Sequence, residues 1–265
     1  MDTAADARIR VGVNGAGGRM GSEACAAIAG DPHLDLVAAV GPRHAGVDVY
    51  GVTVGADLRA FADARCDVVV DFTVAAALRT TLPWLAMHGI HAVVGTSGVD
   101  DDDLEAYRSA FGSGPAHCVI APNFAISAVL MNRLVEIAAP FFDTAEIIEY
   151  HHDRKVDAPS GTALGTAARM AEARNGRPWN PDPTEHESPV GSRGAEGPSG
   201  IRIHAVRMHG MVAHQDVVLG ATGQTLTVRQ DSYDRSSFMP GVVLACRRIA
   251  DHPGLTVGLD RLLGI

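Results

Sequence analysis

Groups that can carry or transfer a proton are concentrated in one short segment, residues 149–164, with the sequence EYHHDRKVDAPSGTAL. Two adjacent imidazoles, His151 and His152, are followed closely by Arg154 and Lys155. Imidazole exchanges a proton near neutral pH, and a lysine ammonium donates a proton or neutralises a developing negative charge. The segment therefore predicts proton transfer beside an anionic substrate.

The second half of this segment is typical of a helix start. Ser160 is a suitable N-cap, and Gly161 and Thr162 would then present backbone amides at the positive end of the helix dipole, where a carboxylate fits. A solvated basic loop before a capped helix is the alternative interpretation. Zinc is disfavoured, because neither an H-E-x-x-H helix nor a cysteine pair accompanies the two histidines, so we expect no metal.

A second signature is the glycine cluster GAGGRMG at residues 15–21, between a predicted strand at 8–14 and a predicted helix at 22–31. Glycines at such a turn let backbone amides approach a pyrophosphate, and the helix N-terminus adds positive potential. Met20 occupies the sixth place of G-x-G-x-x-G, so the fit to the dinucleotide fingerprint is imperfect. A plain tight turn between strand and helix is the alternative.

The elements that must position these groups alternate between strand and helix in the first half of the chain. Further strands are predicted at 34–40, 66–73, 90–98 and 117–124. Short apolar strands alternating with helices predict βαβ units and a Rossmann-type, doubly wound parallel sheet. The motifs DFT and GTSG fall at strand ends, on the carboxyl edge where open α/β sheets bind ligands. We therefore predict hydride transfer from a nicotinamide dinucleotide to a small anionic substrate.

The second half differs in character and predicts a smaller α+β domain. Its expected elements are a helix at 128–139, a strand at 145–150, a helix from about 161, a long surface loop at 175–200, and strands at 201–208, 214–220 and 224–231. Consecutive strands with tight turns indicate an antiparallel or mixed sheet. Their alternation would leave an apolar face too large for a small domain to cover. The tail from Phe238 is predicted to begin as a helix and to pack against the first domain.

Composition restricts the class of protein. A length of 265 residues with 46% hydrophobic residues indicates two domains, and the net charge of −9 disfavours nucleic acid and anionic membranes as partners. The polar start MDTAADA is unlike a secretion signal, and no apolar run is long enough to span a bilayer. The four scattered cysteines predict reduced core thiols in a cytoplasmic protein; they are Cys25, Cys66, Cys118 and Cys246.

The segment HHDRKVDAPSGTAL resembles the signature of the 4-hydroxy-tetrahydrodipicolinate (dihydrodipicolinate) reductase family of lysine and diaminopimelate biosynthesis. The similarity extends over nearly the whole chain, through VNGAGGRMG, DFT, GTSG, APNFAIS and SYDRSSFMPG. It implies a dinucleotide-binding domain formed by residues 1–124 and 235–265, and a substrate-binding and tetramerisation domain at 125–234. It also implies a homotetramer that reduces a cyclic dicarboxylate with NADPH or NADH, with hinges at 123–127 and 233–237.

The resemblance also assigns roles to single residues. His151 matches the family's proton donor and Lys155 its lysine donor, while His152, Gly161 and Thr162 match positions that hold the substrate carboxylates. Of the two donors, we expect His151 to be the acid and Lys155 to balance a carboxylate. The segments that match nucleotide contacts comprise Gly15, Ala16, Gly17, Gly18, Arg19, Met20, Gly95, Thr96, Ser97, Ala121, Pro122, Asn123 and Phe124.

Two positions depart from the family pattern. Arg154 stands where members often carry His or Asn, so we expect its side chain to face away from the chemistry. Gly41 stands where many members place an acid for the adenosine ribose, and Arg43 follows it. We therefore expect Arg43 to pair with the 2′-phosphate of NADPH, and NADPH to be used at least as well as NADH. Solvation of a surface turn by Arg43 is the alternative.

Two other functions remain open at this point. A semialdehyde or homoserine dehydrogenase has a related architecture, but a semialdehyde dehydrogenase needs an activated nucleophilic cysteine. A catalytically silent nucleotide-binding regulator would not need proton donors beside an anion site, which the set of His151, Lys155, Gly161 and Thr162 would supply.

Overall fold

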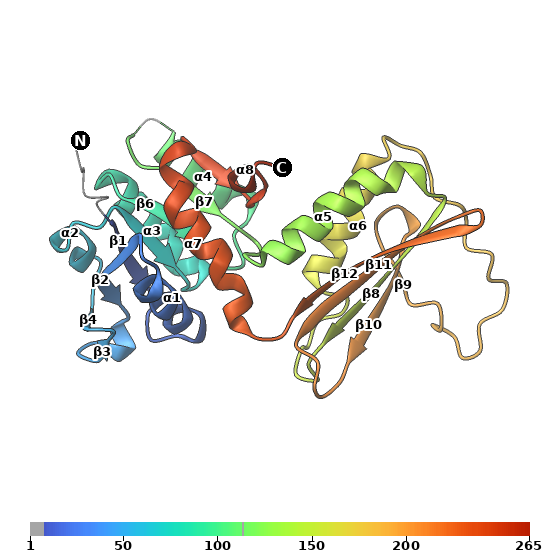
Figure 1. Cartoon of the computed structure of the whole chain (residues 1–265), viewed down its shortest axis with the longest axis horizontal. Coiled ribbons are helices and arrows are strands. Elements are labelled where there is room, and N and C mark those ends of the chain that lie inside the picture. The colour runs from blue at the N-terminus through green and yellow to red at the C-terminus, as the bar shows by residue number, and fades with distance from the viewer. Residues whose placement is uncertain (1–7, 113) are drawn as a thin grey trace. The chain divides into compact units, whose positions relative to one another are not determined.

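The computed structural model describes residues 8–112 and 114–265 (Figure 1). The polar start at residues 1–7, interpreted above as unlike a secretion signal, lies outside the described residues.

The chain forms two compact units. Unit 1 runs up to Ile126 and resumes at Arg235–Ile265, and unit 2 spans Ser127–Asp234. Two segments that are far apart in the sequence therefore form unit 1. The chain passes between the units inside the two segments predicted as hinges, 123–127 and 233–237.

Unit 1 contains a mostly parallel sheet. Among the described residues its strands are β1 (Ile9–Asn14), β2 (Leu34–Val40), β3 (Asp48–Val49), β4 (Val52–Gly55), β5 (Val68–Asp71), β6 (His91–Val94), β7 (Cys118–Ile120) and β13 (Leu255–Val257). They lie in the order β13-β7-β6-β5-β1-β2-β4-β3, and only β3 runs antiparallel to its neighbour. All four residues of β5, VVVD, are buried, as expected for a strand covered on both faces. The predicted Rossmann-type fold is confirmed.

Helices cover this sheet. The helices of unit 1 are α1 (Arg19–Gly30), α2 (Arg59–Asp63), α3 (Ala75–Met87), α4 (Asp101–Phe111), α7 (Met239–Arg248) and α8 (Asp260–Leu263). Side chains of α3 and α4, such as Leu82 and Phe111, share one core cluster with Val69 and Val94 of the sheet. In Figure 1, α1 and α7 lie together on the sheet, and α7 contacts β1, β5 and β6. The tail thus packs on the sheet of the first domain, as predicted.

Several elements of unit 1 were not predicted. Strand β13 follows α7 and pairs in parallel with β7. It was missed because the apolar run LTV is very short and forms a strand only through this pairing. Helix α4 begins at a capping box, in which Asp100 Oδ1 accepts from Asp103 N at 2.8 Å and Asp103 reaches back to Asp100 N. The spacing of these two acids, three residues apart, was the sequence signal for the start of a helix.

Unit 2 contains a mixed sheet with two helices on one face. Its strands are β8 (Thr144–His151), β9 (Ala195–Glu196), β10 (Arg202–Arg207), β11 (Ala213–Ala221) and β12 (Gln224–Ser232), and its helices are α5 (Ile126–Ala138) and α6 (Gly161–Ala173). The order is β12-β11-β8-β10-β9; β8 and β10 are parallel and the other pairs antiparallel. Met131 of α5 and Met170 of α6 pack against Ile147, Val217 and Leu219 of the sheet. The predicted mixed sheet is confirmed.

The prediction that the sheet of unit 2 leaves a large apolar face uncovered is wrong. The apolar face of the sheet lies under α5 and α6. Strand alternation places Glu146, Ile148 and Tyr150 on the other face, where charged pairs dominate. Glu146 Oε1 accepts from Arg193 Nη2 at 2.5 Å, and Asp216 Oδ2 accepts from Arg229 Nη1 at 2.8 Å. The alternation within the strands could not show that the apolar face is covered, because it does not reveal where α5 and α6 pack.

The segment at 175–200 is less irregular than predicted. It contains β9, and its start is held against the domain by Arg174, whose guanidinium donates to Ala139 O and Phe142 O and lies 3.7 Å from the centroid of the Trp179 ring. Trp179 is buried. Asp182 accepts from Arg202 Nε at 3.0 Å. These contacts link distant parts of the chain, which a composition rich in Pro, Gly and Ser does not reveal.

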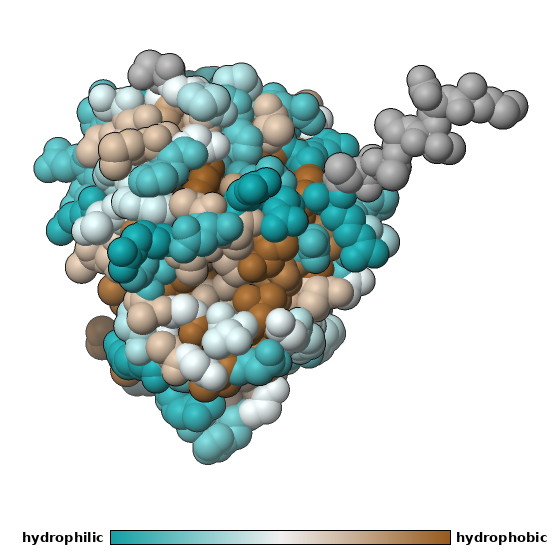
Figure 2. Space-filling view, turned by 90° about the vertical axis from the view of Figure 1, so that its left-hand side faces the viewer, coloured by the Kyte–Doolittle hydropathy of each residue, from teal (hydrophilic) through white to brown (hydrophobic). Residues whose placement is uncertain are grey.

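On the face shown in Figure 2, hydrophilic residues predominate, with hydrophobic residues in a band between them. In the part of the chain that the structure describes, no helix combines the length and the apolar character needed to cross a membrane.

Candidate functional site

The glycine turn of unit 1 connects β1 to α1. Gly15 has φ +82°, and a Cβ there would lie 2.7 Å from the carbonyl oxygen of Phe72, so only glycine fits. At Gly17 a Cβ would collide with the ring of His44. Gly18, the N-cap of α1, has no side chain to occupy the first-turn amides. The turn therefore has the bare backbone and helix terminus that a pyrophosphate requires.

The structure brings the other predicted nucleotide contacts to the same edge of the sheet. Gly95, Thr96 and Ser97 directly follow β6, and Ala121, Pro122, Asn123 and Phe124 directly follow β7. Ala16 and Phe124 are buried, whereas Arg19 and Ser97 are exposed. Because β1, β5, β6 and β7 are parallel neighbours, their carboxyl ends form one continuous edge.

A buried carboxylate, which sequence reasoning did not assign, joins these strand ends. Asp71 is fully buried and accepts hydrogen bonds from Asn14 Nδ2 at 2.7 Å, Thr73 Oγ1 at 2.6 Å and Thr96 Oγ1 at 3.0 Å. Asp71 thus links the carboxyl ends of β1 and β5 to Thr73 and Thr96, which follow β5 and β6. The side chain of Thr96 is engaged inside the protein, so its backbone is the part available to a cofactor. The sequence signal for this buried residue was an acid inside the apolar run VVVDFT.

In Rossmann folds the residues that follow the second strand lie beside the adenosine ribose of the dinucleotide. Gly41 follows β2 with φ −175°, a conformation open to any residue, and a Cβ there would lie 3.6 Å from Gly17 N. A side chain at position 41 would therefore point toward the glycine turn. Arg43 lies in a short 3-10 helix, Pro42–His44, and is exposed. His44 beside Gly17 was not predicted, because its ring reaches the turn only through the fold.

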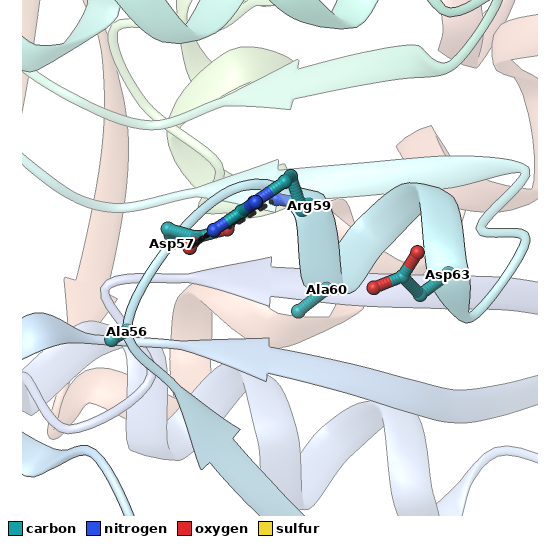
Figure 3. A pocket seen from close by; sticks show the side chains of 5 residues that line it. All are labelled: Ala56, Asp57, Arg59, Ala60 and Asp63. Carbon is teal, nitrogen blue, oxygen red and sulfur yellow. Dashed lines mark hydrogen bonds and ion pairs between the residues drawn. The ribbon is translucent and has the colours of Figure 1, made fainter.

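A shallow pocket of about 410 Å³ lies elsewhere in unit 1, at the start of α2 (Figure 3). It is lined by Ala56, Asp57, Arg59, Ala60 and Asp63. Arg59 Nη2 donates to Asp57 Oδ2 at 2.9 Å, so the one cation of the pocket is already neutralised. None of its lining residues belongs to either predicted site.

The chemistry-bearing segment of unit 2 begins at the end of β8. His151 Nδ1 lies 2.5 Å from Glu149 Oε2, and its side chain is only 17% exposed. Arg207, at the end of β10, donates to both oxygens of Glu149 at 2.8 and 2.7 Å. Burial lowers the pKa of His151, Lys155 and Arg207 lower it further, and Glu149 opposes them.

The two residues after His151 that were predicted to meet the substrate lie in the following loop. Lys155 Nζ donates to both carboxylate oxygens of Asp157, at 2.8 and 2.7 Å, and is close enough to affect the pKa of His151. His152 Nδ1 is buried without a hydrogen-bond partner among the described residues, and a ligand or a water could satisfy it. Arg154 is exposed.

Helix α6 begins as predicted. Ser160 is its N-cap, and Ser160 Oγ accepts from Ala163 N at 3.2 Å. A Cβ on Gly161 would meet no atom within 4 Å, so there is open space beside the first turn. Thr162 lies in that turn and is half-buried. A helix N-terminus with space in front of it can accept a carboxylate.

The cysteines provide no nucleophile. All four are buried and free. Burial raises the pKa of Cys25 to about 11 and that of Cys66 to about 12, and it also raises the pKa values of Cys118 and Cys246. A thiol in such a setting is a core residue, which argues against a semialdehyde dehydrogenase. Within residues 8–112 and 114–265, no group of three or more His, Cys, Asp or Glu could hold a metal ion.

Comparison with known proteins assigns the chain to a family. The family models described as dihydrodipicolinate reductase, N-terminus and C-terminus, match residues 9–124 and 127–263. The 4-hydroxy-tetrahydrodipicolinate reductases of Corynebacterium urealyticum and Corynebacterium efficiens are 48% and 50% identical over 260 residues, 97% of this chain and 99% of each relative.

A solved structure agrees with this assignment. The dipicolinate-bound dihydrodipicolinate reductase from Paenisporosarcina sp. TG-14 superimposes with a TM-score of 0.88 at 36% identity, covering 96% of this chain and 99% of that one. Similarity of this extent covers both units and both groups of site residues. The chain therefore belongs to the dihydrodipicolinate reductase family, whose members are NAD(P)H-dependent oxidoreductases.

Proposed function

We propose that this protein reduces 4-hydroxy-tetrahydrodipicolinate to tetrahydrodipicolinate, a step of lysine and diaminopimelate biosynthesis. NADPH or NADH supplies the hydride, one proton is added, and the 4-hydroxyl group leaves as water. The observation that carries this proposal is the agreement of the family match with the cluster at the end of β8. His151, Lys155 and the N-terminus of α6 form one group in unit 2, and the dinucleotide edge belongs to unit 1. An acid beside a carboxylate site is what reduction of an anionic imine requires.

The residues divide the work as follows. When bound, the reduced nicotinamide supplies the hydride. The glycine turn and the segments after β6 and β7 bind the dinucleotide. His151 delivers the proton, while Lys155, His152, Gly161 and Thr162 bind the substrate carboxylates. Lys155 exchanges Asp157 for a substrate carboxylate when it binds.

A direct assay tests this function. The purified protein is mixed with NADPH and freshly prepared 4-hydroxy-tetrahydrodipicolinate, and the loss of absorbance of the reduced cofactor is followed. We expect oxidation of NADPH that depends on both protein and substrate. Aspartate semialdehyde serves as the control substrate for the dehydrogenase alternative. Binding of NADPH without turnover would instead support a silent nucleotide-binding regulator.

We also propose that NADPH is used at least as well as NADH. Nothing acidic stands at position 41 to repel a 2′-phosphate, and Arg43 is exposed beside it. We expect Arg43→Ala to lower kcat/KM with NADPH about ten- to a hundredfold, since a charge-assisted hydrogen bond contributes roughly 1.5–3 kcal/mol, and to leave NADH almost unaffected. Steady-state kinetics with each coenzyme measure this.

The matched control for Arg43 is Arg59→Ala. Arg59 also lies in unit 1 but is paired with Asp57, so we expect no change in coenzyme preference (Figure 3). The reciprocal variant, Gly41→Asp, fits the extended backbone and should turn preference toward NADH. A wild-type enzyme that prefers NADH by more than about tenfold would show the interpretation of Gly41 and Arg43 to be wrong.

Finally, we propose a homotetramer formed through unit 2. The family resemblance supports this assembly. Helices α5 and α6 pack on one face of the sheet, and the other face carries charged pairs such as Glu146–Arg193 and Asp216–Arg229. We expect light scattering at micromolar concentration to give four times the mass of one chain. A monomer under these conditions would rule the assembly out.

A further inference from the structure

Glu149 is a buried carboxylate to which no role has been assigned. Its side chain is fully buried, yet it accepts hydrogen bonds from three different residues. His151 Nδ1 lies 2.5 Å from Oε2, Arg207 contacts both oxygens, and the backbone N of Ser160 donates to Oε1 at 3.1 Å. A buried charge is costly unless it is paired and hydrogen-bonded. Glu149 meets both conditions, and its partners include the proposed acid and the cap of the proposed carboxylate site.

The fold explains why these groups converge. Residues two apart in a strand share a face, so Glu149 and His151 lie on the same side of β8. Strand β10 runs parallel to β8 with Arg207 opposite His151 in register. The loop after β8 then returns over the strand, and Arg207 Nη2 also donates to Asp157 O in that loop at 2.8 Å. One carboxylate thus joins two strands and the start of α6.

The charges around His151 act in opposite directions. Lys155 and Arg207 disfavour the imidazolium, as burial does, and Glu149 favours it. Burial also disfavours ionisation of Glu149, but the hydrogen bonds from Arg207 and His151 outweigh burial and hold the pKa of Glu149 below its ordinary value. Arg207 therefore keeps Glu149 ionised, and the ionised Glu149 stabilises the charge on His151.

We propose that Glu149 is the positioning residue for His151: it accepts the Nδ1 proton, so that Nε2 carries the proton to be delivered, and it supports the positive charge of the ring. Through the amide of Ser160 it also fixes the N-terminus of α6 relative to His151. This inference rests on the proposed function, in which His151 is the acid. Glu149 itself need not touch the substrate.

The test compares two substitutions on one strand. Glu149→Gln keeps the size of the side chain and removes the charge. Glu146→Gln is the matched control, because Glu146 also lies in β8 and also pairs with one arginine and one histidine, Arg193 and His204. Those pairs lie on the other face of the sheet and leave His151 untouched. Both variants are assayed for kcat/KM across about pH 5 to 9 and for NADPH binding by fluorescence.

We expect Glu149→Gln to lower kcat/KM about tenfold or more near neutral pH and to move the alkaline limb of the profile to lower pH. The direction follows because His151 must be protonated to act, and loss of Glu149 lowers the pKa of His151 further. NADPH binding, a property of unit 1, should stay the same. An unchanged limb in Glu149→Gln, or an equal shift in Glu146→Gln, would overturn the proposal.

A second measurement does not depend on activity or on the folding of a variant at Glu149. Nitrogen-15 NMR of the wild-type imidazoles, with His151 identified by the signal lost in His151→Ala, reports which nitrogen of the neutral ring is protonated. We expect Nδ1, and a neutral ring protonated on Nε2 would refute the positioning role. If the wild type does not reduce the substrate but shows this tautomer, the proposed function fails while the positioning of His151 stands. If the wild type is active but its neutral His151 is protonated on Nε2, the proposed function stands and the positioning role of Glu149 fails.

Discussion

Replacing His151 with alanine is expected to lower kcat by about 10²–10⁴-fold, the usual contribution of a positioned general acid. In the proposed mechanism the imidazole donates the proton, and the structure holds the ring against Glu149 Oε2, whereas alanine can neither donate a proton nor make this contact. Cofactor affinity should hardly change, because the dinucleotide edge belongs to unit 1. Single-turnover oxidation of NADPH and fluorescence titration with NADPH measure the two quantities separately.

The control for this variant is His209→Ala. His209 belongs to the same unit, and its side chain is 92% exposed and pairs only weakly with Asp153, at 3.4 Å. It should retain wild-type turnover. Near-normal kcat in His151→Ala would remove His151 from the role of acid and would leave Lys155 as the candidate donor.

Replacing Lys155 with alanine is expected to lower kcat/KM about ten- to a hundredfold with either coenzyme. A charge-assisted hydrogen bond to a substrate carboxylate contributes roughly 1.5–3 kcal/mol. In the free protein the ammonium is bound to Asp157, so we expect a substrate carboxylate to take the place of the Asp157 carboxylate. Asp157→Asn should therefore lower the KM, and Thr162→Val should weaken binding by less than Lys155→Ala. Initial rates over a range of substrate concentrations measure these effects.

Arg154→Ala is the matched control for Lys155. It removes a cation from the adjacent position, and its side chain is exposed. We expect wild-type kinetics from it. Unchanged kcat and KM in Lys155→Ala, or an equal loss in Arg154→Ala, would contradict the role of Lys155 and would indicate that only the general positive potential of the loop matters.

The sequence alone determined the elements whose signals are local. The glycine turn at residues 15–21, the short apolar strands, and the N-cap at Ser160 depend on residues within a few positions of one another, and each was found. The strands predicted at 66–73, 90–98 and 117–124 are shorter than predicted, at Val68–Asp71, His91–Val94 and Cys118–Ile120. The residues that carry the family resemblance are local in the same sense, since they occur in short continuous motifs. For this reason the Rossmann-type sheet, the mixed sheet and the family could be predicted.

The tertiary structure alone determined the contacts between residues on strands that are far apart in the sequence. Glu149 meets Arg207 across 58 residues of sequence, and Asn14 meets Asp71 across 57, because β8 lies beside β10 and β1 beside β5. Strand order and register place these groups together, and neither is encoded in the residues around each position. A charge inside a strand therefore predicts a partner but cannot name it. The polar support beneath both candidate sites became visible only when the sheets were assembled.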